Sequence, residues 1–311
     1  MEARSIRSAG RALIPGVKHH ERTIEAADGT ALRVEGWEPK NEPRFVVVIV
    51  HGGAEHIGRY DRLAKVFGAL GARCFGLDHR GQGHSGGRRG HVDAFEDYAR
   101  DLRRVIETYA ESLPAEQRPG EIPWFLFGHS MGGLISLTYL LDHAKAIPLA
   151  GAMISSPLIE VAVKVNPVKR WVGNVASRFA PNLSLPTGIP EDAICRDPAE
   201  VERYRKDPRR VGVITAGWFG AMQRAAERVK AQVGGIDVPM LWYVGTGDTI
   251  CSHEAGIAVF RSIPDAGKRG HSLHCFADYY HELHNEPTEL REPVMEMLEE
   301  WVLERVPAES A

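Results

Sequence analysis

The sequence predicts an α/β protein with a mostly parallel central sheet, flanked by helices and interrupted by a helical insertion. Short apolar runs alternate with amphipathic segments up to Pro157, and this alternation resumes near residue 236. The intervening residues contain helical pieces, several Asp-Pro and Asn-Pro breaks, and no convincing strand. Strict β-α alternation is typical of a doubly wound parallel sheet. We therefore assign residues 1–157 and 236–311 to one core and residues 158–235 to a cap.

The elements of the core follow in order along the chain. Residues 20–39 indicate two strands joined by an Asp-Gly turn. The run "RFVVVIVHGG" is apolar on both faces, which is expected of a central parallel strand covered by helices. Further strands are predicted at "ARCFGLD", "IPWFLFGHS", "LAGAMISSP", "VPMLWYVGTGD" and "SLHCFAD". Helices are predicted at "RYDRLAKVFGALG", "FEDYARDLRRVIETYAESL", "MGGLISLTYLLDH", "SHEAGIAVFRSI" and "EPVMEMLEEWVLERV".

Composition limits the class of protein. The 311 residues are 43% hydrophobic and 25% charged, which is ordinary for a globular chain with a large core. A net charge of −3 gives no reason to expect a nucleic acid partner. The sequence leaves the oligomeric state open.

The cysteines and the amino terminus bear on location. The four cysteines are scattered without a C-x-x-C pair, which favours a reduced, cytoplasmic chain. The basic start has no apolar core for a secretory signal, although its Arg- and Ser-rich character leaves a transit peptide as a minor alternative. No apolar run approaches the roughly 20 residues that span a bilayer. Peripheral membrane contact remains open.

Residues 128–132, "GHSMG", fit the G-x-S-x-G pattern between a predicted strand and a predicted helix. In that context the serine lies on a sharp turn, where side chains at the two glycine positions would collide with neighbouring elements. Ser130 is therefore the candidate nucleophile. Because a serine hydroxyl is weakly nucleophilic at neutral pH, it needs a base and an acid that orients the base.

Asp248 and His281 fit these two roles. Asp248 ends the strand "VPMLWYVGTGD", at the carboxyl edge where active sites of parallel sheets lie. His281 follows the last predicted strand, which gives the chain order serine, acid, histidine. The alternatives are a helix-capping aspartate and a surface histidine. The negative oxygen of the tetrahedral intermediate needs backbone N–H donors, and we expect these at Met131 and Gly53.

These motifs together resemble the monoacylglycerol lipase and lysophospholipase family of serine α/β-hydrolases. The resemblance runs from about residue 20 to the last helix, through "HGGAEHIGRY", "DHRGQGHSGGRRGHV", "GHSMGG" and "YHELHNE", with "PNLSL" and "CRDPAEVERYRKDP" in the cap. It implies the same triad and oxyanion donors. It also implies polar contacts at the glycerol end of the substrate pocket from Glu55, Arg59, Tyr204 and His284.

The resemblance has two further implications near the site. Cys251 matches a cysteine close to the active site, so that thiol reagents are expected to inhibit. Ala54 departs from the family, which usually has glycine there, and its methyl group is expected to crowd or shift the oxyanion loop.

The insertion is expected to be a lid. The stretch "NPVKRWVGNVASRF" puts Trp171, Val175 and Phe179 on one helical face. That face either packs over the pocket and excludes water or contacts lipid and admits acyl chains. Trp218 and Phe219 also fall in the lid. Its neighbouring basic residues are Lys169, Arg170 and Arg178.

Other motifs favour no second function. "GQGHSG" formally fits a dinucleotide-binding motif, but no helix opens inside it. "HELH" lacks the metalloprotease spacing, and His79, His84 and His91 have no convincing partner ligands. We expect no metal and no cofactor. Ser155 and Ser156 lack elbow glycines, and Ser130 in place of aspartate argues against epoxide hydrolases and haloalkane dehalogenases.

The predicted reaction is two-step hydrolysis of the carboxylic ester of a monoacyl lipid through an acyl-enzyme. Lysophospholipid hydrolysis and short-chain ester hydrolysis use the same chemistry and remain alternatives. Acyl transfer to an alcohol is a second alternative. A non-catalytic binding protein on a hydrolase scaffold is the third.

Overall fold

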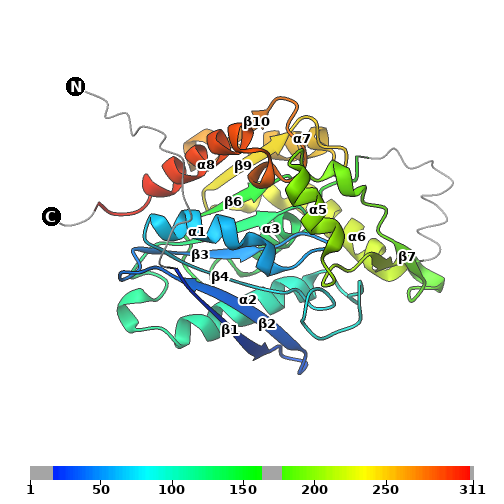
Figure 1. Cartoon of the computed structure of the whole chain (residues 1–311), viewed down its shortest axis with the longest axis horizontal. Coiled ribbons are helices and arrows are strands. Elements are labelled where there is room, and N and C mark those ends of the chain that lie inside the picture. Colours follow the sequence, from blue (N-terminus) through cyan, green and yellow to red (C-terminus); the bar gives the residue numbers. More distant parts are fainter. Residues whose placement is uncertain (1–16, 163–176, 309–311) are drawn as a thin grey trace.

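The computed structural model describes residues 17–162 and 177–308. Its main strands are β1 Lys18–Glu25, β2 Ala31–Glu38, β3 Phe45–Val50, β4 Ala72–Leu77, β5 Trp124–His129, β6 Gly151–Ser155, β9 Met240–Gly245 and β10 Ser272–Phe276. They form one sheet in the order β1-β2-β4-β3-β5-β6-β9-β10. Contacts involving β2 are antiparallel and the remaining neighbours pair parallel, so the predicted mostly parallel sheet is confirmed (Figure 1).

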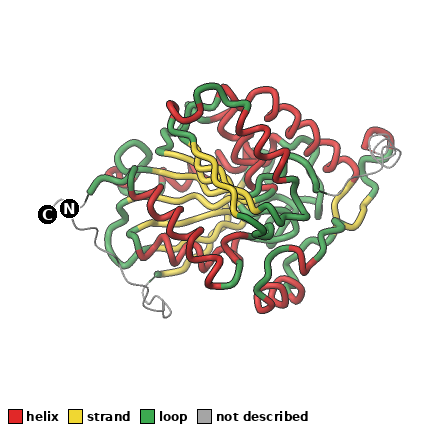
Figure 2. Tube along the Cα trace, turned by 90° about the horizontal axis from the view of Figure 1, so that it is seen from above, coloured by secondary structure: helices red, strands yellow, loops and turns green. Residues whose placement is uncertain are grey.

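Helices cover both faces of the twisted sheet (Figure 2). The α-helices are α1 Asp61–Ala69, α2 Glu96–Glu111, α3 Met131–His143, α5 Pro198–Lys206, α6 Ala216–Gln232, α7 His253–Arg261 and α8 Thr288–Leu303. Single turns of 3-10 helix occur at Ile57–Tyr60, Ala115–Gln117, Glu191–Ala193, Val233–Gly235, Ala266–Arg269 and Leu283–Asn285.

The central strand β3 explains why both faces need cover. All six of its residues are buried. Phe45, Val47 and Ile49 join the apolar cluster that contains α1 and α8. The alternating residues Val46, Val48 and Val50 join the cluster that contains α2, α3, α6 and α7. Because successive side chains of a strand point to opposite faces, a continuous apolar run is what this sandwiched position requires.

The insertion contains strands that the sequence pattern does not predict. β7 Ser184–Pro186 and β8 Val213–Thr215 form a small antiparallel sheet, so the expectation of an insertion without strands is wrong. Three residues are too few to show a period of two. This sheet attaches to a core loop, since the Thr215 N–H donates to the Gly90 carbonyl at 2.9 Å. A Cβ atom at Gly90 would lie 2.0 Å from the Val213 carbonyl oxygen.

Helix α6 ends the predicted cap but packs on the core. Its buried residues Ala221, Ala225 and Val229 belong to the same apolar cluster as α3. The boundaries of the cap at residues 158 and 235 remain a prediction. Trp171, Val175, Lys169 and Arg170, like the amino-terminal 16 residues, lie outside the described residues. Within the described residues, no helix combines the length and apolar character needed to cross a bilayer.

Candidate active site

Ser130 lies on a strained turn between β5 and α3. Its backbone has φ 56° and ψ −119°, in the left-handed half of the map that a residue with a side chain rarely occupies. A Cβ atom at Gly132 would lie 2.0 Å from the Val50 carbonyl oxygen, and one at Gly128 would lie 2.7 Å from the Gly132 carbonyl oxygen. These contacts explain why the motif needs glycine on both sides of the serine.

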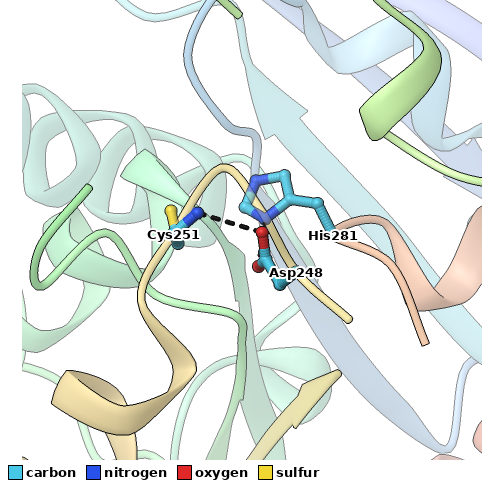
Figure 3. Close-up of side chains that lie close together, drawn as sticks. All are labelled: Asp248, Cys251 and His281. Atoms are coloured by element: carbon cyan, nitrogen blue, oxygen red, sulfur yellow. Dashed lines mark hydrogen bonds and ion pairs between the residues drawn. The ribbon is translucent and has the colours of Figure 1, made fainter. Parts of the chain in front are cut away.

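Asp248 and His281 form a buried pair beyond the carboxyl ends of β9 and β10. His281 Nδ1 lies 2.6 Å from Asp248 Oδ2 (Figure 3). The other carboxylate oxygen, Oδ1, accepts the N–H groups of Ile250 at 2.8 Å and Cys251 at 2.9 Å. Each oxygen of Asp248 therefore has its own partners, and the carboxylate cannot turn away from the imidazole without losing them.

Electrostatics around His281 favour its charged form. Burial by itself lowers the pKa of His281, but the Asp248 carboxylate and its hydrogen bond, assisted by Glu282 and Glu55, raise the pKa above the ordinary value of 6.5. The neighbouring His129 ring lies 4.6 Å away, centroid to centroid, and burial holds its pKa well below 6.5. One neutral imidazole thus packs against one that can accept a proton.

The hydroxyl of Ser130 lies beside a thiol. Its Oγ atom is 3.9 Å from Cys251 Sγ. Within residues 17–162 and 177–308, no hydrogen bond joins Ser130 to His281, although both residues line the same cavity. Burial and the charge of Asp248 raise the pKa of the Cys251 thiol well above its usual range, so that the thiol is poorly ionised.

The loop after β3 presents Gly53 to the cavity. Gly52 before it is held on both sides, because its N–H donates to Glu55 Oε1 and its carbonyl accepts from His51 Nδ1 at 2.7 Å. His51 Nε2 in turn accepts the His79 N–H at 3.0 Å, which fixes the tautomer. Burial lowers the pKa of His51 to about 3, so this imidazole is neutral.

Two other residues near this loop bear on oxyanion binding. Ala54 has φ 57° and is buried, so the predicted departure from glycine falls at a position with left-handed backbone. Met131 begins α3, and the N–H groups of the first helical turn have no partner within the helix.

A cavity with about 830 Å³ of empty space, counting its open mouth, passes over Ser130 and His281. Most of its wall is apolar, while Glu55, Glu282 and Tyr204 of the cap lie together at one part of it, which we call the polar end, since Arg59 contacts all three. The apolar lining residues are Ala54, Met131, Leu158, Val161, Ile189, Ile194, Ile214, Trp218, Phe219, Met222 and Ile250. Of the predicted lid aromatics, Trp218 is buried and donates its Nε1–H to the Tyr98 hydroxyl at 3.1 Å, whereas Phe179 is 78% exposed.

A buried ion cluster, which we call the charge bridge, lies behind the polar end of the cavity. It consists of Glu55, Arg59 and Glu282. Arg59 Nη1 donates to Glu55 Oε2 and to Glu282 Oε1, each at 2.6 Å, while Nη2 donates to Glu282 Oε2 at 2.7 Å. Burial alone would raise the pKa of Glu282, but the Arg59 guanidinium lowers it to about 2.

The four predicted substrate contacts divide into two pairs. Glu55 and Tyr204 line the cavity, whereas Arg59 and His284 are not among its lining residues. Arg59 packs under Tyr204, with its guanidinium carbon 4.8 Å from the ring centroid. His284 stacks on Tyr60, with ring centroids 5.3 Å apart. Direct contact of all four residues with substrate stays a prediction.

In two clusters of potential metal ligands, the carboxylates already have protein partners. Asp248, Cys251 and His281 place ligand atoms within 4.8 Å of one another, but Asp248 and His281 bond to each other. A second cluster contains Glu35 and Asp78. The Arg33 guanidinium bonds to both carboxylates and supplies the positive charge that a metal ion would otherwise provide.

A family model described as serine aminopeptidase, S33 (Hydrolase_4) matches residues 41–288. The chain belongs to the Hydrolase_4 family.

Two curated relatives of the chain are named as lipases. The chain is 31% identical to monoglyceride lipase of Rattus norvegicus over 90% of this chain and 89% of the relative. It is 30% identical to monoacylglycerol lipase of Mycolicibacterium smegmatis, over 91% of this chain and 96% of the relative. An uncharacterized abhydrolase domain-containing protein of Dictyostelium discoideum is also 30% identical over 90% of this chain, which spans only 28% of that longer protein. The predicted resemblance and ester hydrolase class are confirmed.

Two solved lipase structures superpose on the chain. Monoacylglycerol lipase of Paleococcus ferrophilus superposes with a TM-score of 0.75 at 28% identity, covering 88% of this chain and 99% of that one. Monoglyceride lipase of Saccharomyces cerevisiae gives a TM-score of 0.83 at 22% identity, covering 97% and 100% of the two chains. The predicted α/β-hydrolase fold is confirmed.

Sequence reasoning missed several residues of the site. Glu282 adjoins His281 in sequence, and Tyr60 adjoins Arg59, so both stand inside motifs that were singled out. Tyr60 donates its hydroxyl to Glu55 Oε1 at 2.8 Å. His51 and His129 also lie in those motifs. The sequence does show that one motif contains an arginine and that a distant motif contains a glutamate. It does not show that the two side chains pair, because only the fold brings the motifs together.

Proposed function

We propose that this protein hydrolyses the carboxylic ester of a monoacylglycerol through an acyl-enzyme on Ser130. The observation that carries the proposal is the Asp248–His281 hydrogen bond, placed beside a strained serine in an apolar cavity. The combination supplies a nucleophile, an oriented base and a site for an acyl chain.

In this mechanism His281 takes the proton of the Ser130 hydroxyl as its oxygen attacks the ester carbonyl. Asp248 keeps the proton of the imidazole on Nδ1 and stabilises the cation that forms. The N–H groups of Gly53 and Met131 bind the oxyanion. The imidazolium then protonates the leaving alcohol, and water deacylates the serine by the same route in reverse.

The serine must turn toward the imidazole during this step. Rotation about a single side-chain bond moves Oγ away from Cys251, to which it makes a long contact of 3.9 Å. Hydrogen bonds between catalytic groups commonly tighten in the substrate complex. The long thiol contact is therefore compatible with a serine that transfers its proton to His281 once the ester is bound.

The cavity favours a neutral monoacyl lipid over a lysophospholipid. Its apolar part can bury an alkyl chain, at a gain of about 0.8 kcal/mol per methylene. Among the described residues, those that line it include two carboxylates and neither lysine nor arginine. A phosphate would therefore meet negative charge without a free cation, whereas a glycerol hydroxyl can donate to Glu55 or Glu282. The names of the rat and mycobacterial relatives support the same substrate.

Transient contact with a membrane or micelle is part of the proposal. Apolar side chains of the insertion are exposed, and one of them, Val161, also lines the cavity that a lipid substrate would enter. The exposed ones are Val161, Phe179, Leu183, Leu185 and Val213. Two of them, Leu185 and Val213, lie in the small sheet of β7 and β8, where Leu185 pairs with Ile214 and Val213 with Pro186.

The test compares wild type with Ser130→Ala on monoacylglycerols, lysophospholipids and p-nitrophenyl esters of increasing chain length. We expect monoacylglycerol to be preferred and the variant to lose about 10⁴-fold in turnover. A fluorophosphonate should label wild type and fail to label the variant. Near-normal rates in the variant would refute the nucleophile, and a preference for lysophospholipid would refute the substrate.

Two added measurements separate the remaining reactions. Products formed with added alcohol distinguish hydrolysis from acyl transfer. An amino acid p-nitroanilide tests the aminopeptidase activity in the family description. We expect no cleavage, because the cavity is lined mostly by apolar side chains, which suit an acyl chain and do not replace the hydration of a substrate ammonium.

A further inference from the structure

The loop that carries the proposed oxyanion donor Gly53 is fixed through its neighbour. Gly52 donates its N–H to Glu55 and accepts at its carbonyl from His51. In a trans peptide the C=O of one residue and the N–H of the next point in opposite directions. Because the Gly52 carbonyl points toward His51, the Gly53 N–H points in the opposite direction within the same peptide plane.

Glu55 can hold Gly52 only if Glu55 is itself held. Tyr60 donates to its Oε1 atom at 2.8 Å and Arg59 to its Oε2 atom at 2.6 Å. Burial raises the pKa of Glu55, and the charge of Arg59 opposes that rise. Without the guanidinium, the carboxylate would be buried beside the oxyanion site with its charge uncompensated, which is costly.

The same guanidinium holds the loop of the proposed base. Arg59 makes two parallel hydrogen bonds to Glu282, the residue that follows His281. Glu282 is fixed further by the Asn285 side chain at 2.8 Å and by its own N–H, which donates to the Ile194 carbonyl at 2.7 Å. One side chain from the end of the oxyanion loop thereby reaches a segment 223 residues away in sequence.

From these contacts we infer that Arg59 is a positioning residue, which sets the oxyanion loop and the loop of His281 at a fixed separation. This inference rests on the proposed function. Arg59 acts through Glu55 and Glu282 and does not touch the substrate. Only a planar, forked cation can meet both carboxylates in this way, since a lysine offers a single point of charge.

A role as ligand for glycerol is the rival explanation, and it fits the contacts less well. The side chain of Arg59 is 6% exposed, and it is not among the residues lining the cavity. Its terminal nitrogens bond to Glu55 and Glu282, and Tyr204 covers it from the cap. A substrate hydroxyl would have to displace one of these charged partners.

The experiment measures Arg59→Lys and Arg59→Met on two substrates with the same acyl chain, a 1-monoacylglycerol and a methyl ester. Active sites are titrated with a fluorophosphonate, so that rates refer to correctly assembled enzyme. Arg62→Lys is the matched control, because Arg62 pairs with Glu200 of the cap and contacts Asn285 without reaching Glu55 or Glu282. Thermal unfolding of each variant gives its stability separately.

We expect kcat per active site to fall about 10²-fold in Arg59→Met and about tenfold in Arg59→Lys, equally on both substrates and with little change in KM. The fluorophosphonate labelling rate should fall in parallel, because that reaction uses the same nucleophile and oxyanion donors. If Arg59→Met does not fold, Tyr60→Phe replaces it. It removes one donor to Glu55 and should lower kcat in the same direction, by a smaller factor. Arg62→Lys should keep its kcat.

Two results would overturn the inference. A loss confined to the monoacylglycerol would make Arg59 a ligand of the glycerol group. Normal kcat per active site with a lowered unfolding temperature would make the charge bridge a stabilising element alone. Failure of the proposed function is a separate result, visible as wild-type enzyme that is not labelled or as Ser130→Ala that still turns over.

Discussion

The two ends of the cavity differ in how they can recognise a substrate. The apolar end is lined by Leu158 and by Ile214, Trp218 and Met222 of one continuous stretch of the insertion, and these side chains offer only shape and apolar area. At the other end, the charge bridge fixes Glu55 and Glu282 before any ligand arrives. The apolar end is therefore expected to tolerate change in the acyl chain, whereas small changes at the charged end should disturb the chemistry.

The largest expected effect lies between the two ends, at Asp248. In Asp248→Asn, the amide oxygen would accept the N–H groups of Ile250 and Cys251, leaving the NH2 group facing His281 Nδ1. The imidazole would then carry its proton on Nε2 and could not accept one from Ser130. We expect kcat to fall about 10⁴-fold, measured on a methyl ester per folded enzyme. A loss below tenfold would contradict the role assigned to Asp248.

At the apolar end, Met222→Trp should change which acyl chain is preferred. The larger side chain would fill space at a buried lining position. Each methylene that no longer fits loses about 0.8 kcal/mol, or about fourfold in kcat/KM. Methyl esters of increasing chain length test this with a constant alcohol. An unchanged optimum would mean that the chain lies elsewhere, and the kcat on the shortest ester serves as the control.

At the charged end, Glu282→Gln should move the pH profile. Glu282 is one of the charges that raise the pKa of His281, so its removal lowers that pKa. Because the neutral imidazole is the active base, activity falls as pH drops through this pKa, which in wild type lies above 6.5. The acid limb of kcat/KM should shift to lower pH in the variant. A shift to higher pH would contradict the electrostatic account.

The smallest expected effect is at Ala54, in the loop beside the charge bridge. Left-handed backbone costs a residue with a Cβ atom about 1–2 kcal/mol, and glycine avoids most of this cost. Glycine also makes the unfolded chain more flexible, which lowers the free energy of unfolding by about 0.4–1 kcal/mol. Ala54→Gly should therefore stabilise the fold by at most about 1 kcal/mol, measured by urea unfolding. Gly188 also has left-handed backbone and has open space around it. Gly188→Ala is therefore the reverse control, and it should lower the free energy of unfolding.

The sequence predicted the parts of the site that depend on topology. Ser130, Asp248 and His281 follow strands that run parallel, and the carboxyl ends of parallel strands meet at one edge of the sheet. The pairing of Arg59 could not be predicted in this way. Its residue type fits both a substrate ligand and a buried ion pair, and its partner Glu282 lies in a distant segment. The short strands β7 and β8 were missed because three residues carry no periodic signal.

The contact between β8 of the insertion and Gly90 of the core limits which sequence changes the protein can accept. The Val213 carbonyl oxygen lies 2.0 Å from where a Cβ atom at residue 90 would stand, so any side chain there would displace the backbone of β8, whose Ile214 lines the cavity. The space available to an acyl chain is thus governed partly by a position that touches no ligand. Natural or engineered variants with altered chain-length selectivity are to be sought in this support as well as in the lining itself.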